Sequence, residues 1–182
     1  SLSFILSAPL ITVRDSLYHR WRSRLKVFER KNRLSGEEDV HLGHIRVVVF
    51  GMGRMGSAAF TAIERDLGEG LVGVEIDPQK AAEHRAAGRN VISGDATNPD
   101  FWTRTPVLID GLEWVLLTLP THNANMAAVQ RLREMGYGGR IAATSKYADE
   151  MEALQSLDVD FAFNIYNEAG IGFANELKGL MR

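Results

Sequence analysis

Ile45-Arg-Val-Val-Val-Phe-Gly-Met-Gly-Arg-Met-Gly-Ser57 is the stretch of this sequence that decides its fold. Its first half is an apolar run typical of a buried strand, and its second half has the pattern Gly-x-Gly-x-x-Gly over residues 51–56. Such a glycine pattern also arises by chance, so its surroundings matter. Here a helical run follows over 54–67, and a second apolar strand follows over 71–76. Together they predict a βαβ unit of the dinucleotide-binding type.

The three glycines have separate roles in such a unit. Gly51 permits the tight turn after the strand, Gly53 lets the backbone approach a phosphate, and Gly56 lets the helix pack close to the sheet. The N–H groups and the dipole of the helix start then hold the anion. Glu75 lies 75 − 56 = 19 residues past the last glycine, close to the roughly 20 that separate the glycines from a ribose-binding carboxylate. We therefore expect an adenine nucleotide, with NAD or AMP favoured over NADP because Glu75 would repel a 2′-phosphate.

Composition and charge exclude several classes of protein. A chain of 182 residues that is 45% hydrophobic can bury one full core, whereas two domains would be cramped. The absence of cysteine excludes a disulfide framework and a cysteine zinc site, and the five histidines lack ligand-like spacing. A net charge of −2 argues against a nucleic-acid partner. The charge is uneven, however, because residues 14–33 carry 8 − 2 = +6 and the remainder −2 − 6 = −8.

Strands and helices are predicted to alternate from residue 45 onward. Strands are expected near 45–50, 71–76, 90–93, 112–119, 140–144 and 161–165. Helices are expected near 54–67, 78–87, 99–104, 122–135, 148–156 and 167–180. Such alternation with short links predicts an α/β fold whose parallel sheet is covered on both faces. Six strands make a complete Rossmann-like, doubly wound sheet, expected in the order 3-2-1-4-5-6.

The first 43 residues need a separate interpretation. Leu2–Val13 is apolar but has only 12 residues, fewer than the roughly 20 that span a bilayer, and it lacks the basic region of a signal peptide. From Leu10 to Phe28, apolar residues recur at three- and four-residue steps among arginines, which predicts a basic amphipathic helix. Two interpretations stay open: a helix that packs on the body or on a second copy, and the stump of a transmembrane helix followed by a juxtamembrane helix. A polar linker over 35–43 would join either to a domain over 44–182.

Four further side chains near the expected site have an interpretation from their position in the sequence. Arg54 opposes the helix dipole, which pairing with a phosphate would offset. Met52 and Met55 are expected to pack around the nucleotide. Asp77 is interpreted mainly as the N-cap before Pro78, with a secondary role at the ribose.

Two further loops are expected near the ligand. Asp95, in the Gly-Asp-Ala-Thr run over 94–97, is favoured as an acceptor for the adenine amino group over a plain turn residue. Asn125, one turn into the fifth predicted helix from His122, would reach a ligand or solvent. His122 has no carboxylate partner in the sequence to orient it, so we interpret it as a residue of the helix start and not as a catalytic base.

Four motifs together resemble the RCK domains, also called KTN or TrkA-N domains. They are GMGRMG at 51–56, VEIDP at 74–78, GDATNPDFW at 94–102 and LPTHNANMAAVQ at 119–130. The arginine in the glycine loop and the Gly-Asp-Ala-Thr run separate this family from ordinary dehydrogenases. The resemblance covers about residues 44–182 and implies a cytoplasmic nucleotide-binding domain that gates a potassium channel or transporter. LSFILSAPLITVRDSLYHRW at 2–21 looks like the last membrane helix and exit linker of Kef-type potassium efflux systems, which are cation:proton antiporters.

The resemblance also implies ligands, partners and a location. AMP or NAD(H) would bind, and the domain would pair as a homodimer across the sheet edge. The membrane transport domain would belong to the same polypeptide, an ancillary oxidoreductase-like subunit is a further candidate partner, and the site of action would be the cytoplasmic face of the inner (plasma) membrane. The expected nucleotide contacts are Gly51, Met52, Gly53, Arg54, Met55, Gly56, Glu75, Asp77, Asp95, Ala96, Thr97 and Thr118.

Glutathione control, known for some Kef-type members, is in doubt here. Those members have Ala-Arg-Ala-Arg on the fifth strand, where this sequence has Ala-Thr-Ser-Lys over 143–146. Arginine binds a carboxylate with two parallel hydrogen bonds, and threonine and lysine do not replace it.

We therefore expect a regulatory domain without catalytic residues. One alternative is an NAD-dependent dehydrogenase, which the absence of a substrate domain after the sixth strand disfavours. The other is a free-standing nucleotide sensor subunit of a potassium transporter.

Overall fold

The computed structural model describes residues 44–105 and 111–181. The predicted membrane stump, basic helix and linker over 1–43 lie outside the described residues, so those three interpretations stay predictions. None of the helices in the described part is both long and apolar enough to cross a lipid bilayer.

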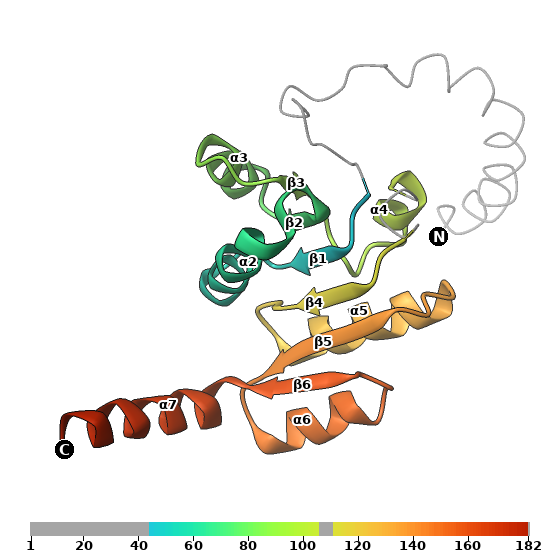
Figure 1. Ribbon diagram of the computed structural model, residues 1–182. Coiled ribbons are helices and arrows are strands. Elements are labelled where there is room, and N and C mark those ends of the chain that lie inside the picture. Colours follow the sequence, from blue (N-terminus) through green and yellow to red (C-terminus); the bar gives the residue numbers. More distant parts are fainter. Residues whose placement is uncertain (1–43, 106–110, 182) are drawn as a thin grey trace, which may run out of the picture. The chain divides into compact units, whose positions relative to one another are not determined.

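A six-stranded parallel sheet forms the centre of the domain, and Figure 1 shows its strands pointing the same way. Its strands are β1 (Val47–Phe50), β2 (Leu71–Glu75), β3 (Val91–Ser93), β4 (Trp114–Leu117), β5 (Arg140–Ser145) and β6 (Phe161–Asn164). The strand order is β3-β2-β1-β4-β5-β6, with every pair parallel. The predicted α/β class, the doubly wound topology and the strand order are confirmed.

The helices follow the strands as the alternation predicted. They are α2 (Arg54–Leu67), α3 (Pro78–Ala86), α4 (Pro99–Arg104), α5 (His122–Glu134), α6 (Ala148–Gln155) and α7 (Ile165–Leu180), with a short 3-10 turn, η1 (Gly68–Gly70). The starts of α3 and α4 are capped by Asp77 and Asn98, each followed by proline as predicted. The start of α7 was predicted two residues too late, because Asn164 caps the helix by accepting from the Asn167 N–H.

The core is divided by the sheet into two apolar layers. Val47 and Val49 of β1 point into one layer, where Phe60 of α2 packs. Val48 and Phe50 point into the other, larger layer, which α4, α5 and α6 cover. Strands buried on both faces read as continuous apolar runs, which explains the Val-Val-Val-Phe stretch.

Helix α7 differs from the others because none of its residues is buried. Figure 1 shows it continuing from β6, the strand at the edge of the sheet. Its large apolar side chains are therefore exposed.

Close packing at the end of β1 accounts for two of the glycines. Gly51 has φ = +89°, a conformation that side chains rarely adopt, and its N–H donates to the Val74 carbonyl at 2.9 Å. A Cβ on Gly56 would overlap the Gly51 carbonyl oxygen and the Thr118 hydroxyl. A Cβ on Gly53, in contrast, would have no atom of residues 44–105 or 111–181 within 4 Å. Gly51 and Gly56 thus let α2 start against the sheet, whereas Gly53 leaves space above the loop.

These environments predict losses of stability of different size for alanine at the two positions. Gly56→Ala should lower the free energy of unfolding by about 3 kcal/mol, because the obstructing atoms include backbone. Gly53→Ala should cost less than about 1 kcal/mol, since only the N-cap preference is affected. Urea unfolding of both variants, freed of bound ligand, measures the difference, and equal losses would contradict the packing described.

Candidate functional site

The predicted site residues gather where β1, β2, β3 and β4 end. Because the strands are parallel, their carboxyl ends share one edge, and β1 and β4 are neighbours although a crossover separates them in sequence. In open α/β sheets a ligand binds in the crevice at such a switch point. Four loops therefore contribute, after residues 50, 75, 93 and 117.

The glycine loop presents unpaired donors at the start of α2. Gly53 is the N-cap residue with extended backbone, no side chain caps the helix, and its first turn has no acidic residue. The N–H groups of a first helical turn have no partners within the helix. Arg54 is exposed and forms no hydrogen bond or ion pair with any described residue. Open space, free N–H groups and a free guanidinium together fit a phosphate group.

Glu75 is the buried carboxylate of the site. Only 6% of its surface is exposed. Its Oε2 accepts from the Met52 N–H at 3.0 Å and its Oε1 from the Asp77 N–H at 3.1 Å. The side chain therefore joins the glycine loop to the end of β2. Each carboxylate oxygen has a second lone pair, so this arrangement can also accept hydrogen bonds from the hydroxyls of a ribose.

The Met52 backbone is held on both sides. Its carbonyl oxygen accepts from the Ser57 hydroxyl at 2.8 Å and from His84 Nε2 at 2.9 Å, while its N–H donates to Glu75. Its side chain is only 2% exposed and fills the space that Gly73 leaves open. This side chain belongs to the core under α2, and the expectation that it packs around a nucleotide stays a prediction.

Thr118 connects β4 to the glycine loop. Its hydroxyl lies 3.0 Å from the Phe50 carbonyl oxygen and 2.7 Å from that of Gly51, and it donates to this pair. The same hydroxyl would obstruct a Cβ on Gly56. Thr118 thus holds the glycine loop against the end of β4 through its hydroxyl. A direct contact of Thr118 with a nucleotide stays a prediction.

The Gly-Asp-Ala-Thr run after β3 forms its own hydrogen-bonded turn. The N–H and the hydroxyl of Thr97 both donate to Asp95 Oδ1, at 2.8 and 2.7 Å. Ala96 is buried, and its carbonyl accepts from the Trp102 indole at 2.9 Å. Asp95 Oδ2 has no partner among the described residues, so the predicted contact with an adenine amino group remains open to it.

Other predicted residues have structural roles. The Asp77 carboxylate accepts from the N–H groups of Gln79 and Lys80, which confirms its interpretation as an N-cap. Asn125 was expected to reach a ligand or solvent, and this was wrong. Its buried amide accepts from the Leu119 N–H and donates to the Thr144 carbonyl, joining the ends of β4 and β5.

His122 is the first residue of α5, as predicted, and no described carboxylate contacts it. Met55 is half-buried on the first turn of α2. Within the described part of the chain, no group of three or more histidine, aspartate and glutamate side chains could hold a metal ion.

Two residues of this region were missed by sequence reasoning. Ser57 and His84 both bind the Met52 carbonyl, one from α2 and one from α3. Ser57 directly follows the glycine motif and is not one of its defined positions. His84 is 32 residues from Met52 in the sequence, and no periodic pattern links the two.

Removal of Glu75 should therefore destabilise the fold more than removal of its neighbour. Glu75→Ala leaves the buried Met52 N–H and the partly buried Asp77 N–H without their acceptor and should lower the free energy of unfolding by about 3 kcal/mol. Asp77→Ala removes only an exposed cap and should cost about 1 kcal/mol. Chemical denaturation of the two variants tests this order, and a smaller loss for Glu75→Ala would refute the bridging role.

Comparison with known proteins places the chain among domains of one family. The family model described as the TrkA-N domain matches residues 47–165. Among curated proteins, none matches the sequence.

Three solved structures share the fold at low identity. The NAD(P)-binding domain of an exopolyphosphatase-related protein from Archaeoglobus fulgidus has a TM-score of 0.65 at 15% identity, covering 74% of this chain and 98% of its own. The TrkA-N domain of the inner membrane protein ybaL from Escherichia coli has a TM-score of 0.61 at 20% identity, covering 72% and 96%. The Shewanella denitrificans Kef CTD in its AMP-bound form has a TM-score of 0.59 at 15% identity, covering 75% and 80%.

Proposed function

The chain belongs to the TrkA-N domain family, and from that membership we propose that it is the nucleotide-binding regulatory domain of a potassium efflux system or another monovalent cation:proton antiporter. The single observation that carries the proposal is the open, unpaired glycine loop held against the buried Glu75 carboxylate. This arrangement supports a phosphate on the loop and a ribose at Glu75.

We propose AMP or NAD(H) as the ligand. The Kef CTD was solved with AMP, and the Archaeoglobus fulgidus domain is named as NAD(P)-binding. The Glu75 carboxylate would repel a 2′-phosphate, which favours NAD over NADP. Asp95 Oδ2 is suited to the adenine amino group, and Arg54 to a phosphate.

A regulatory role is favoured over a dehydrogenase. Hydride transfer on a bound substrate needs an acid–base group beside the reacting carbon. After β4 and β5, the described residues offer His122, which no carboxylate orients, and Lys146, whose ammonium donates to the Pro120 carbonyl at 3.1 Å. The described carboxyl edge thus supports binding better than catalysis.

A homodimer is the proposed assembly, formed through β6 and α7. Tyr166, Phe173, Leu177 and Leu180 are exposed and follow one another at steps of seven, four and three, so they form one stripe along α7. Phe161, the first residue of the edge strand β6 that leads into this helix, is exposed as well. An apolar stripe continuous with an open sheet edge suits a second copy of the same surface, because a two-fold dimer buries both stripes at once.

Regulation would follow from nucleotide binding in such a dimer. A ligand shifts an arrangement only if it binds two arrangements with different affinity. We propose that the nucleotide biases the dimer, and that the predicted helix over 14–33 transmits the change to a membrane transport domain of the same polypeptide on the cytoplasmic face of the inner membrane. A separate transporter and an ancillary oxidoreductase-like subunit are the alternative partners.

Titration of the full chain with AMP and with NAD tests the ligand. Arg54→Ala should weaken the tighter of the two by about tenfold, the usual range for a charge-assisted phosphate contact. Arg65→Ala is the matched control, because this arginine is exposed at the opposite end of the same helix. Equal affinities for the two variants, or no binding of either nucleotide, would contradict the proposal.

Light scattering of the chain after gel filtration tests the dimer. Phe173→Glu places a charge on a side chain that is 74% exposed in the single chain and should convert dimer to monomer. Asn175→Glu adds the same charge two residues further along α7, which places it on the opposite side of the helix, and should leave the dimer intact. A monomeric unmodified chain would refute this assembly without affecting the nucleotide site.

A further inference from the structure

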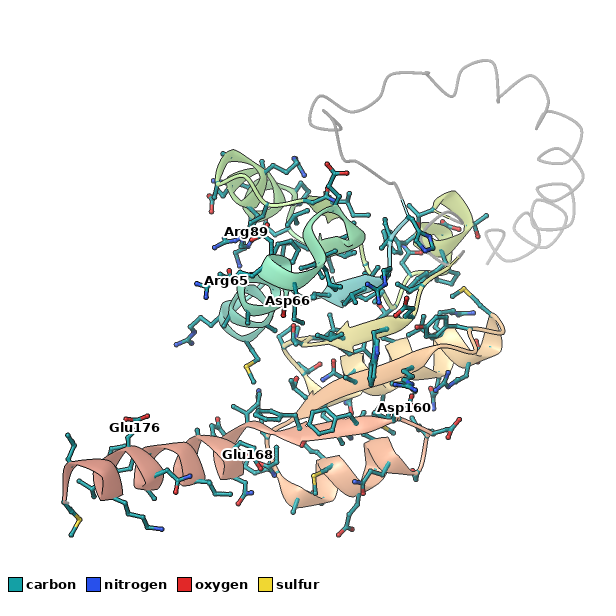
Figure 2. The ribbon with its side chains drawn as sticks, viewed as in Figure 1. Arg65, Asp66, Arg89, Asp160, Glu168 and Glu176 are labelled. Atoms are coloured by element: carbon teal, nitrogen blue, oxygen red, sulfur yellow. The ribbon has the colours of Figure 1, made fainter. Side chains whose placement is uncertain are left out.

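His84 lies on α3, outside the glycine loop, yet it contacts the backbone of that loop. Its Nε2 lies 2.9 Å from the Met52 carbonyl oxygen. Its Nδ1 lies 2.9 Å from NH1 of Arg89, which is in the segment between α3 and β3 (Figure 2). Both ring nitrogens are therefore engaged, one with the loop and one with a cation.

These partners assign the hydrogen on the ring. A carbonyl oxygen only accepts, so Nε2 must carry the hydrogen that binds Met52. A guanidinium only donates, so Nδ1 must have a free lone pair for Arg89. In this arrangement His84 is the neutral Nε2–H form.

The hydrogen bond from His84 also sets the direction of the next N–H. In a trans peptide the carbonyl and the N–H point in opposite directions. The Met52 carbonyl is turned toward the protein by His84 and Ser57, so the Gly53 N–H of the same peptide points away from them. Gly53 N–H has no acceptor among the described residues, and the space beside Gly53 is open.

We infer that His84 is a positioning residue that aims the glycine loop at a nucleotide phosphate, and that proton binding to its ring strengthens nucleotide binding. This inference rests on the proposed nucleotide site and adds a regulatory input to it. If Nδ1 also carried a hydrogen, it and the Arg89 guanidinium would be two donors facing each other with no acceptor between them. Arg89 must then move away from the ring. The charged ring keeps its bond to Met52 and places a positive charge beside the phosphate-binding loop.

Linkage then fixes the direction of the effect. Without a nucleotide, the positive charge on the ring is opposed by the neighbouring Arg89 guanidinium. With a nucleotide, the phosphate compensates that charge, so protonation and binding favour each other. Affinity for the nucleotide should therefore rise as the pH falls.

The charged groups around His84 are few and can be named. Glu75 accepts from the Met52 N–H, in the preceding peptide unit, and Arg85 on α3 donates to the Val91 carbonyl. None of the remaining charged residues of α3 and α2 hydrogen-bonds to His84 in the described structure: Lys80, Glu83, Arg54, Glu64, Arg65 and Asp66. Arg89 is thus the described side chain whose contact with the ring depends directly on the proton.

The test titrates AMP and NAD into the full chain and into His84→Gln between about pH 5.5 and 8. Glutamine can donate to the Met52 carbonyl but does not titrate. The unmodified chain should bind about three- to tenfold more tightly at the lower pH relative to His84→Gln, because proton binding and nucleotide binding favour each other. The AMP phosphate itself titrates near pH 6, but that contribution is common to both proteins and cancels in the ratio.

Three further proteins separate positioning from charge. His84→Ala, which lacks the donor, should bind more weakly at every pH. Arg89→Ala should move the pH dependence to higher pH, because the group that opposes protonation is gone. His44→Gln, at the amino end of β1, should behave like the unmodified chain.

The outcomes distinguish this inference from the proposed function. If neither nucleotide binds at any pH, the proposed function fails, and the inference fails with it. If a nucleotide binds and its pH dependence is the same in His84→Gln, only the inference fails. Nitrogen NMR of labelled histidine in the nucleotide-free chain is an independent readout: the neutral Nε2–H form supports the inference, and the Nδ1–H form overturns it.

Discussion

The hydrogen bonds of the Glu75 carboxylate are the interaction on which the rest of the site depends. Its two oxygens hold the N–H groups of Met52 and Asp77, so a single side chain fixes the glycine loop after β1 and the turn after β2. A buried carboxylate is costly without such partners. Placed here, it also presents a negative charge to whatever occupies the loop. In the proposed site, the negative charge of Glu75 would also favour a ribose without a 2′-phosphate.

Around this interaction, the loop is assembled in layers that leave its donors free. Gly56 brings α2 against the sheet, Thr118 supports the loop from β4, and Ser57 with His84 turns the Met52 carbonyl inward. The acceptors in these hydrogen bonds are the backbone carbonyl oxygens of Gly51 and Met52. None of these contacts uses the Gly53 N–H, and Arg54 has no partner among the described residues. Hydrogen bonds therefore hold the glycine loop in place, while the donors that would bind a phosphate have no acceptor among the described residues. This is the arrangement expected of a preformed anion site.

Much of this could be predicted from sequence, because the strong signals were local. Apolar runs, prolines after Asp77 and Asn98, and the glycine spacing predicted the strand order and nearly every helix start. The misses involve contacts across the fold. Met52 lies inside the glycine motif, but its side chain packs in the core where Gly73 leaves room. The side-chain amide of Asn125 joins the ends of two strands. His84 binds a carbonyl 32 residues away. Such pairings depend on tertiary distances that no periodicity encodes.

The central claim is that the loop beside Glu75 holds an adenine nucleotide. The most direct measurement is to denature the purified chain and identify the released small molecules by mass spectrometry, with Glu75→Ala purified in parallel. The account predicts AMP or NAD(H) from the unmodified chain in near-equal proportion to protein, and little from the variant. Recovery of NADP, or equal recovery of nucleotide from both proteins, would contradict it.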